Sequence, residues 1–476
     1  MLAIVAAIAL AAAGQAAAER YVVLYPERGW DVWRAGSDVK KAGGSVVAAY
    51  PQIDVVIAES EDPGFAAKLD RNRDVEGVAS VGSVIATAAG WGWGSDGGGL
   101  PSSPVLEGDP FSPLQWYARR IKAPDAHKIT GGSPKVLVGV IDTGVDASHP
   151  DLNGNIDFSR SVSCVGGKAN RDQAAWNDDS GHGTNVAGVI AAEANGQGIV
   201  GIAPNVKLAI VKASTRRGTT DIFLADAVVC ALVWAADNGV DVANNSYSVD
   251  SALMGGTTSF CRTDPAQRVI IKAVKRAVDY AQRRDVSMVA SAGNNGRDMS
   301  DPALDGCSRL PSGLPGVLTV SSIGLFDRLA VGPPSNWGLG FVDLTAGGGD
   351  FTQGPPPTGL VLGPWPASMQ VPNLLCDPCT GPDAAFYRYF AGTSQAAAQV
   401  SGVAALVVSQ FGRKSWWSGG GKMDPDRVSL ILRQTADPLP CPVGDARCVT
   451  EGNQNGFFGN GVVNALRAVE HDKRNP

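Results

Sequence analysis

The feature that most constrains the fold is a series of short, nearly continuous apolar segments that begins after residue 108. KVLVGVID (135–142) is the first, and KLAIVKA, DVANNSYS, SMVASAGN and VLTVSSI follow it. Such strands are typical of parallel sheets, because both of their faces must be covered. The stretches GTNVAGVIAAEA, DIFLADAVVCALVWAADNG and VIIKAVKRAVDYAQRR alternate with them and have helical spacing. This alternation predicts a doubly wound, mostly parallel α/β domain over residues 108–476.

A smaller unit precedes that domain. Strand patterns in YVVLY, VVIAES and VASVGSVIAT are separated by the helical patterns WDVWRAGSDVKKAG and PGFAAKLDRNRDV. They predict a small α+β module of order βαββαβ at residues 19–88. Residues 89–107 include GWGWGSDGGGLPSSP and form a Gly/Ser/Pro-rich linker that cannot build a core. An exposed linker of this kind is where we expect proteolytic processing.

The N-terminal stretch MLAIVAAIALAAAGQAAAER is an apolar run that ends in small residues. It is typical of a secretory signal peptide, here residues 1–18 with cleavage after Ala18, and it predicts a secreted, extracellular protein. The alternative is an uncleaved membrane anchor, although the run is short for a span of about 20 residues. No later segment has the pattern of a stable membrane anchor.

The net charge of the chain excludes one class of partner. The chain of 476 residues has a net charge of −6 and no basic block, so nucleic acid is not an expected partner. We expect a monomer.

Eight cysteines in an exported chain indicate disulfides. Cys441 and Cys448 lie close in a loop that a bridge could close. Cys376 and Cys379 form CDPC, for which a structural bridge or two free thiols is favoured over redox catalysis, because the strand-to-helix context of a redox motif is missing. The remaining predicted pairs are Cys261 with Cys307, each of which follows a predicted strand of one sheet, and, as a second choice, Cys164 with Cys230.

Three residues are candidates for nucleophilic catalysis. His182 lies between glycines in DDSGHGTNVAGVIAA, where another strand end could approach the imidazole closely. Asp142 ends the buried strand KVLVGVID, and Ser394 opens a helix of small residues. A base with a nucleophile and an orienting carboxylate is a catalytic triad. Taken singly, Asp142 and Ser394 are better explained as helix caps.

Taken together, DTGVDASHPDL, GHGTNVAGVIAA and AGTSQAAAQVSGVAALV resemble the three motifs of the subtilisin family, in that family's order of Asp, His and Ser. The resemblance covers about residues 108–470, and the first unit is similar to the family's inhibitory propeptide. The resemblance implies a serine endopeptidase that hydrolyses polypeptides through an acyl-enzyme intermediate and is made as a zymogen. In these roles Ser394 attacks, His182 transfers the proton and Asp142 orients the imidazole.

The resemblance also implies residues that bind the substrate. Asn294 in SAGNNG matches the side-chain donor to the oxyanion, although Asn-Asn-Gly also favours a turn. The predicted substrate edge and primary pocket consist of Ser246, Tyr247 and Ser248 on one side, with Ser291, Ala292 and Gly293 opposite and Arg309 at the floor. Arg309 would favour acidic or polar side chains if it faces the pocket, and the alternative is that it points to solvent.

A calcium site is the one cofactor that the resemblance implies. Asp151 matches a carboxylate ligand, and Asp109 resembles a further one. In the loop ANGQGIVGIAP and just before it, Asn195 offers a side-chain oxygen, and Glu193, Gln197 and Ile199 offer carbonyls. The alternative is a solvated Gly-rich loop held by Asn turns.

The chain departs from the family pattern at four positions. Gln395, Ala398 and Gln399 stand where Met, Pro and His are usual, and Asn185 stands where His is usual. None of these is a triad or oxyanion position. Two other functions remain open: a dedicated processing protease for one partner protein, and a non-catalytic binding scaffold, which would have no need of an intact triad.

Overall fold

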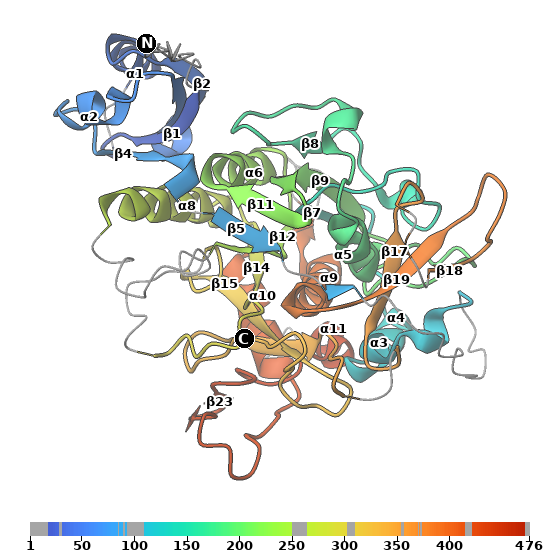
Figure 1. Ribbon diagram of the computed structural model, residues 1–476. Helices are drawn as coiled ribbons and strands as arrows, with labels where there is room; N and C mark the ends of the chain where they lie inside the picture. The colour runs from blue at the N-terminus through green and yellow to red at the C-terminus, as the bar shows by residue number, and fades with distance from the viewer. Residues whose placement is uncertain are drawn as a thin grey trace, which may run out of the picture.

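The computed structural model describes residues 18–27, 31–83, 85–88, 91–92, 109–249, 264–301, 310–353, 357–369, 371, 374–414 and 421–471. Figure 1 shows a small N-terminal domain (blue) that rests on the helical layer of a larger α/β domain. Within these described stretches, no helix has both the length and the apolar character needed to cross a membrane.

The larger domain is built on a seven-stranded sheet in which every neighbouring pair of strands is parallel. Its order is β16-β15-β14-β12-β7-β9-β8, with strands β7 (Leu137–Asp142), β8 (Val162–Ser163), β9 (Lys207–Lys212), β12 (Val242–Asn245), β14 (Ser287–Ser291), β15 (Val317–Ile323) and β16 (Leu344–Gly347). Along β7, Val138 and Val140 join the core on one face, whereas Leu137 and Ile141 join the core on the other. The predicted doubly wound parallel sheet is therefore confirmed.

Helices cover both faces of this sheet. One face carries α3 (Trp116–Arg120), α4 (Ala123–His127), α5 (His182–Ala191), α9 (Thr393–Phe411), α10 (Pro425–Thr435) and α11 (Ala465–Glu470), and the other carries α6 (Ala225–Asp237) and α8 (Pro265–Gln282). Every residue of α9 from Thr393 to Val408 is buried. Small side chains allow this helix to run through the domain centre.

One helix prediction was wrong at its start. DIFL (221–224) belongs to β11 (Thr220–Leu224), and α6 begins only at Ala225. β-Branched and aromatic residues favour strands. β11 also pairs on both sides, with β10 (Ser214–Arg217) and with β5 (Ile85–Ala88).

The small domain has the expected βαββαβ order of elements: β1 (Glu19–Leu24), α1 (Val32–Lys41), β2 (Ser45–Tyr50), β3 (Val55–Ser60), α2 (Phe65–Asp70) and β4 (Gly77–Ser80), with short 3-10 turns at Pro51–Ile53 and Val81–Ser83. The sheet is antiparallel, in the order β2-β3-β1-β4. Tyr21 and Val23 face α1 and α2, whereas Val22 and Leu24 share a core with α6 and α8. The small domain therefore buries its second face against the larger one.

The segment VASVGSVIAT does not form the single strand that its pattern suggested. Its first half is β4, and its second half is β5, which leaves the small domain and enters a sheet of the larger one. β5 lies between β11 and β13 (Ser248–Val249), antiparallel to both. Figure 1 shows β5 as a blue arrow that crosses beside β11.

Residues 325–390, which precede α9, contain several short strands. Besides β16, they hold β17 (Val361–Trp365), β18 (Leu375–Cys376) and most of β19 (Phe386–Ala391). β19 pairs with all of β17, β18 and β6 (Trp91–Gly92). The remaining described elements are β20 (Arg413–Lys414), β21 (Gly421–Lys422), β22 (Thr450–Glu451), β23 (Gln454–Asn455) and 3-10 turns at Ser112–Leu114, Asn153–Asn155 and Gln173–Trp176.

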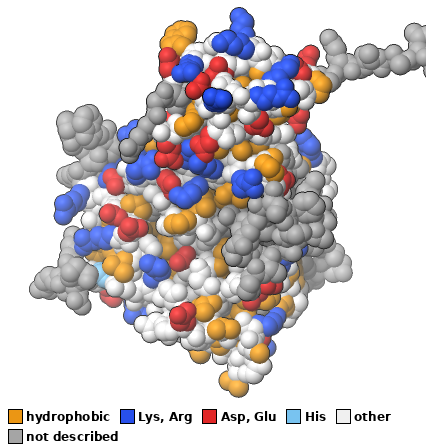
Figure 2. Space-filling model, turned by 90° about the vertical axis from the view of Figure 1, so that its left-hand side faces the viewer, with side chains coloured by type: hydrophobic (Ala, Val, Ile, Leu, Met, Phe, Trp, Pro, Cys, Tyr) orange, Lys and Arg blue, Asp and Glu red, His pale blue; other side chains and the backbone are white. Residues whose placement is uncertain are grey.

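Figure 2 shows one face of the molecule, on which basic and acidic side chains are interspersed. On this face, the described side chains therefore form no large field of a single sign of the kind that attracts nucleic acid.

Candidate active site

Asp142 and His182 come together where the end of β7 meets the start of α5. Asp142 is the last residue of β7, and His182 is the first residue of α5. His182 Nδ1 lies 2.7 Å from Asp142 Oδ1, and both side chains are buried. The Thr143 N–H donates to the same carboxylate oxygen at 2.7 Å. The contact with Asp142 holds the imidazole ring in one orientation. It engages Nδ1, so Nε2 is the ring nitrogen that Asp142 does not contact.

The glycines beside His182 permit this approach, as the sequence predicted. A Cβ on Gly183 would lie 2.1 Å from the Gly144 carbonyl oxygen. Gly181 has a φ of +89°, and a Cβ there would meet the Trp365 ring at 2.3 Å. Any larger residue would push α5 away from the end of β7.

Ser394 lies at the start of α9, immediately after β19 and the Gly392–Thr393 junction. Its hydroxyl donates to the Ser246 carbonyl at 3.0 Å, and the Ser246 hydroxyl donates back to the Ser394 carbonyl at 3.0 Å. Among the described residues, His182 Nε2 is buried and has no hydrogen-bond partner. The Ser394 hydroxyl is thus directed to the Ser246 carbonyl and not to His182 Nε2.

The first turns of α5 and α9 are in contact, which brings His182 and Ser394 near each other. The Gln395 side-chain amide donates to Asn185 Oδ1 at 3.2 Å. The His182 ring stands edge-on to Phe390, with ring centroids 6.4 Å apart. All three triad candidates thus meet at the carboxyl edge of the sheet, where open α/β sheets form their sites.

Asn294 is held in place by Thr393, the residue before Ser394. Its Oδ1 accepts from the Thr393 N–H at 2.9 Å and from the Thr393 hydroxyl at 3.0 Å. Because the side-chain oxygen accepts both hydrogen bonds from Thr393, the amide nitrogen is the end of this side chain that can donate. The Gly293 N–H donates to Thr393 Oγ1 at 3.1 Å, which ties the two loops together.

Two carboxylates that were not predicted surround His182. Buried Asp178 accepts five hydrogen bonds, from the Thr143 and Thr184 hydroxyls and from the backbone N–H groups of Ser180, Gly181 and Thr184. It thereby satisfies the amino end of α5. Its signal in the sequence is the DDSG immediately before His182, which resembles an ordinary helix cap.

The second unpredicted carboxylate, Asp221, lies on β11 and accepts from the Ser180 hydroxyl. Burial alone would lower the pKa of His182, but the charge and hydrogen bond of Asp142, together with the charges of Asp221 and Asp178, outweigh it and raise the pKa. Burial raises the pKa of Asp221 as well. The site therefore favours a protonated imidazolium, the form that a general base takes once it has accepted a proton.

The predicted substrate edge is paired with a strand of the same chain. Ser248 opens β13, and β5 pairs with it. Tyr247 turns inward, stacks on Phe223 at a centroid distance of 4.4 Å and donates to Asn245 Oδ1, so only its backbone belongs to the edge. On the opposite wall, the Ser291 hydroxyl donates to the Tyr247 carbonyl at 3.4 Å, and Ala292 is buried. Gly293 has a φ of +95°. Arg309 lies outside the described residues.

Two of the candidate calcium ligands have unsatisfied buried oxygens. Asp151 Oδ2 accepts from Ile199 N–H and from the Tyr387 hydroxyl, and Asp109 Oδ1 accepts from Gly196 N–H. The other oxygens, Asp151 Oδ1 and Asp109 Oδ2, are buried with no partner among the described residues. Burial and the nearby charges of Asp109 and Glu193 raise the pKa of Asp151 well above its usual range.

The other calcium candidates line the same loop but already have partners. Glu193 Oε1 accepts from Gly154 N–H, and Asn195 Oδ1 accepts from Gln197 N–H. The Gln197 amide donates to the Asp377 carbonyl at 2.6 Å. In the described parts of the chain, no three His, Cys, Asp or Glu side chains are grouped as a metal site. Any cation here would therefore need main-chain and amide oxygens besides the two carboxylates with unsatisfied oxygens, a ligand set that suits calcium.

Three disulfides are present in the described residues: Cys164–Cys230, Cys376–Cys379 and Cys441–Cys448. The first and third confirm predicted pairs, and the second confirms the structural interpretation of CDPC. Cys261 and Cys307 lie outside the described residues.

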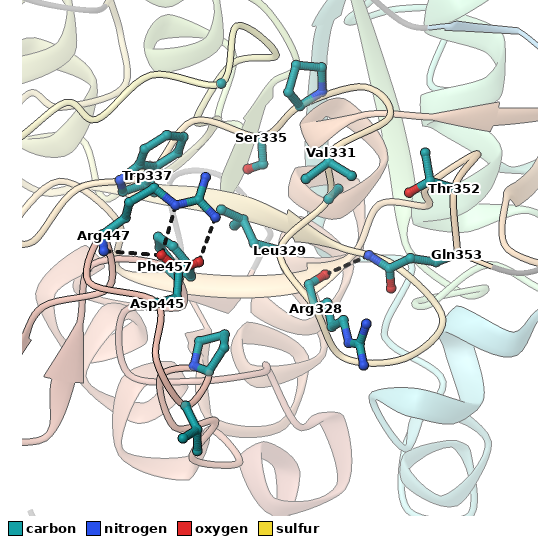
Figure 3. Close-up of a pocket in the computed structure, with 15 residues that line it drawn as sticks. Arg328, Leu329, Val331, Ser335, Trp337, Thr352, Gln353, Asp445, Arg447 and Phe457 are labelled. Carbon is teal, nitrogen blue, oxygen red and sulfur yellow. Dashed lines mark hydrogen bonds and ion pairs between the residues drawn. The ribbon is translucent and has the colours of Figure 1, made fainter.

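A cavity of about 710 Å³, whose lining residues are drawn in Figure 3, contains none of the triad candidates. Its wall includes Trp337 and Phe457 and, from the loop closed by the Cys441–Cys448 disulfide, the ion pair of Asp445 and Arg447. We assign it no role in the chemistry.

Comparison with known proteins agrees with this geometry. A family model described as the subtilase family matches residues 133–461. The chain belongs to the subtilase family. This subtilase is 31% identical over 376 residues to a thermophilic serine proteinase from Bacillus sp. (strain AK1), covering 78% of this chain and 69% of that protein.

Two further relatives fit the same assignment. Fervidolysin from Fervidobacterium pennivorans is 29% identical over 328 residues, 67% of this subtilase and 41% of that protein. Its crystal structure has a TM-score of 0.69 over 97% of this chain and 62% of that chain, at 24% identity. The structure of a lanthipeptide protease has a TM-score of 0.58 at 27% identity, over 77% of this chain and 99% of that one. The subtilase is thus a subtilisin-like serine endopeptidase that acts on polypeptides.

Proposed function

We propose that this subtilase is a secreted endopeptidase, made as a zymogen, that cleaves peptide bonds through Asp142, His182 and Ser394. The observation that carries the proposal is the 2.7 Å contact between His182 Nδ1 and Asp142 Oδ1, next to a serine at the start of a buried helix. The apolar N-terminal run and the three disulfides support export.

In the proposed reaction the Ser394 hydroxyl oxygen attacks the substrate carbonyl while its proton passes to His182 Nε2. The Asn294 amide and the Ser394 N–H donate to the oxygen that becomes negative. His182 then protonates the departing amine, which leaves an ester on Ser394, and water hydrolyses the ester by the same proton route. Asp142 stabilises the imidazolium at each stage.

A fluorophosphonate probe tests this assignment. It should label the processed enzyme at Ser394, and Ser394→Ala should abolish both labelling and hydrolysis of casein while the unfolding midpoint stays close to the wild type. Absence of labelling in a folded, processed wild-type enzyme would favour the non-catalytic scaffold instead.

The zymogen part of the proposal is supported by β5, which occupies the edge between β11 and β13 where a substrate strand would add. Residues 19–88, supplied as a separate peptide, should inhibit the processed enzyme. A purified precursor that is fully active without a lag and without cleavage would contradict it.

We propose calcium as a structural ion at Asp109 and Asp151, with oxygens of Glu193, Asn195, Gln197 and Ile199. A divalent cation would compensate the two buried carboxylates whose second oxygens have no partner. A chelator should shorten the half-life of thermal inactivation, and added calcium should restore it, because a ligand of the native state stabilises by mass action. An unchanged half-life in a metal-free preparation would remove the site.

A dedicated processing protease is the second candidate, and it shares all of this chemistry. It is favoured by the similarity to the lanthipeptide protease. A peptide-library profile separates the two: a broad degrader cleaves many sequences, whereas a processing enzyme accepts one narrow motif.

A further inference from the structure

Arg388 places a positive charge beside the proposed base, His182. The guanidinium carbon of Arg388 lies 4.6 Å from the centroid of the Trp365 ring and 5.3 Å from that of the Phe390 ring. The two rings lie against each other, with centroids 5.5 Å apart, and Phe390 stands edge-on to His182. A guanidinium plane stacked on aromatic rings is held in position, so Arg388 presents a fixed cation close to the site.

Within the described parts of the chain, Arg388 has no carboxylate partner. Its Nε is buried and has no hydrogen-bond partner there. Burial lowers the pKa of Arg388, and no neighbouring charge contributes to this shift. By contrast, Arg276, which is more deeply buried, pairs with Glu76 at 2.7 Å. A guanidinium stays charged at neutral pH, so a half-buried one without an acidic partner is suited to bind an anionic group from outside.

The cation and the two rings line one face of β19. Side chains alternate along a strand, so Arg388 and Phe390 project from the same face, whereas Tyr389 between them joins a hydrophobic core on the other. The Trp365 ring belongs to the first face and also approaches Gly181 at the start of α5. This face of β19 therefore looks toward the helix that carries the proposed base.

The pairing of β6 with β19 shows the course that an extended chain takes past this face. β6 pairs antiparallel with Phe390 and Ala391, and its chain runs away from Ser394 in the N-to-C direction. Counted from the position that pairs with Phe390, the position two residues further along such a chain lies opposite Arg388. On this edge, between β6 and β18, Arg388 and Tyr389 have no strand partner among the described residues.

The order of β5 and β6 gives the direction of a bound substrate. β5 comes first in the chain and lies between β11 and β13, and β6 follows on β19. A substrate in the same direction places the part before its scissile bond at β11 and β13. The part after that bond then runs along β19 toward Arg388.

We infer that Arg388 binds an acidic side chain of the substrate, on the part that leaves as the amine, so that the enzyme prefers Asp or Glu there to Asn or Gln. The inference rests on the proposed endopeptidase function. A carboxylate can accept two parallel hydrogen bonds from a guanidinium that is held in one plane. Because Arg388 is already half-shielded from water, this pair should be stronger than an ion pair on an open surface.

Internally quenched peptides that share one cleaved bond test the inference. Each peptide carries a single Glu or Gln at one of about six positions after that bond, and each ends in an amide so that the chain end adds no carboxylate. At one position kcat/KM should be at least about fivefold higher for Glu than for Gln. Its two immediate neighbours should show little difference, because side chains alternate along an extended chain. High salt should weaken the preference.

The variant Arg388→Gln assigns the preference to this side chain. It should lower the ratio of the two kcat/KM values to about one, by slowing hydrolysis of the Glu peptide. Arg171→Gln is the matched control, because it removes another guanidinium that lies over a tryptophan ring, that of Trp234. The control should leave the ratio as in the wild type. Should Arg388→Gln fail to fold, Arg388→Met keeps an unbranched chain against the rings and gives the same readout.

Three results would overturn the inference. These are the absence of a Glu preference at every position in the wild type, a preference that survives the loss of Arg388, and an equal loss of activity on the Glu and Gln peptides. The last result would show that Arg388 only supports the aromatic rings. Each applies to an enzyme that labels with fluorophosphonate and leaves the endopeptidase function intact, whereas absence of labelling refutes that function itself.

Discussion

The contacts of Asn294 allow its proposed catalytic role to be separated from its structural one. Asn294→Ala removes the amide donor to the oxyanion, and it also removes the acceptor of two hydrogen bonds from Thr393. Loss of one such donor costs about 2.7–4 kcal/mol of barrier in a subtilisin, a relative of this enzyme, or roughly 100- to 1000-fold in kcat. The two lost hydrogen bonds are worth roughly 0.5–1.5 kcal/mol each in stability.

Two further variants separate the effect on catalysis from the effect on stability. Asn294→Asp keeps an oxygen for Thr393 but has no amide donor and adds a negative charge near the oxyanion, so kcat should fall at least as far as in Asn294→Ala while stability is retained. Thr393→Val removes the hydroxyl that donates to Asn294 and accepts from Gly293 N–H. It should lower stability by roughly 1–3 kcal/mol and lower kcat only slightly.

The assay is steady-state hydrolysis of a peptide anilide, with urea unfolding of the same preparations. The propeptide should be supplied as a separate chain so that folding does not depend on self-cleavage. An interaction made only in the transition state lowers kcat and kcat/KM equally, so KM should be nearly constant. If Asn294→Ala loses no more activity than Thr393→Val, Asn294 is a structural residue and the oxyanion assignment is wrong.

Three further predictions follow from side chains around the site. Asp221→Asn removes one of the charges that raise the pKa of His182, so the acid limb of the kcat/KM profile should move to lower pH, because the neutral base becomes available earlier. Asp178→Ala leaves five donors without their acceptor and should lower the free energy of unfolding by roughly 3 kcal/mol or more. Replacing Cys376 and Cys379 by Ser should shorten the thermal half-life in calcium, because Asp377 between them binds Gly198 N–H and the Gln197 amide.

Each of these predictions has a matched control. Asp237→Asn also removes a carboxylate but is not among the charges that raise the pKa of His182, so the profile should stay in place. Asp179, the half-exposed neighbour of Asp178, makes an ion pair with Lys212. Asp179→Ala should lower the free energy of unfolding by about 1 kcal/mol or less. Ser in place of Cys441 and Cys448 removes a disulfide away from the calcium loop. Equal effects in a variant and its control would refute the reasoning for that pair.

Local sequence was sufficient where a residue's role depends on its own segment. The run KVLVGVID predicted both the burial of β7 and the position of Asp142 at its end, and the glycines around His182 predicted the close approach of that strand. The order of the three motifs then indicated that Asp142, His182 and Ser394, which lie far apart in the sequence, belong to one site. These predictions succeeded because strand burial and tight glycine contacts are encoded within a few residues.

Sequence was insufficient where the partner decides the structure. VASVGSVIAT has strand character throughout, but only its distant partners, β11 and β13, draw the second half into another sheet. DIFL has a helical neighbour in sequence and became a strand because β5 and β10 pair with it. Asp178 resembles a cap, and its link to Thr143 appears only when the end of β7 is folded against α5. The pairs of β5 with β11 and β13 join segments more than 100 residues apart, and β-propensity in one segment does not show which distant segment it will pair with.

The departures from the family pattern are connected in space. Gln395, which stands where Met is usual, donates to Asn185, which stands where His is usual. The amide of Gln399, a second replaced His, donates to the Gln395 carbonyl at 3.0 Å and to the Gly347 carbonyl at 2.6 Å. All three side chains are buried, where a polar group left without its partner costs about 1–3 kcal/mol. A return to Met at Gln395 alone would therefore leave Asn185 Oδ1 without this donor, so the exchanges at these two positions compensate one another. Because Asn185 lies one turn after His182 and Gln395 directly follows Ser394, this hydrogen bond joins the helix of the proposed base to the helix of the proposed nucleophile.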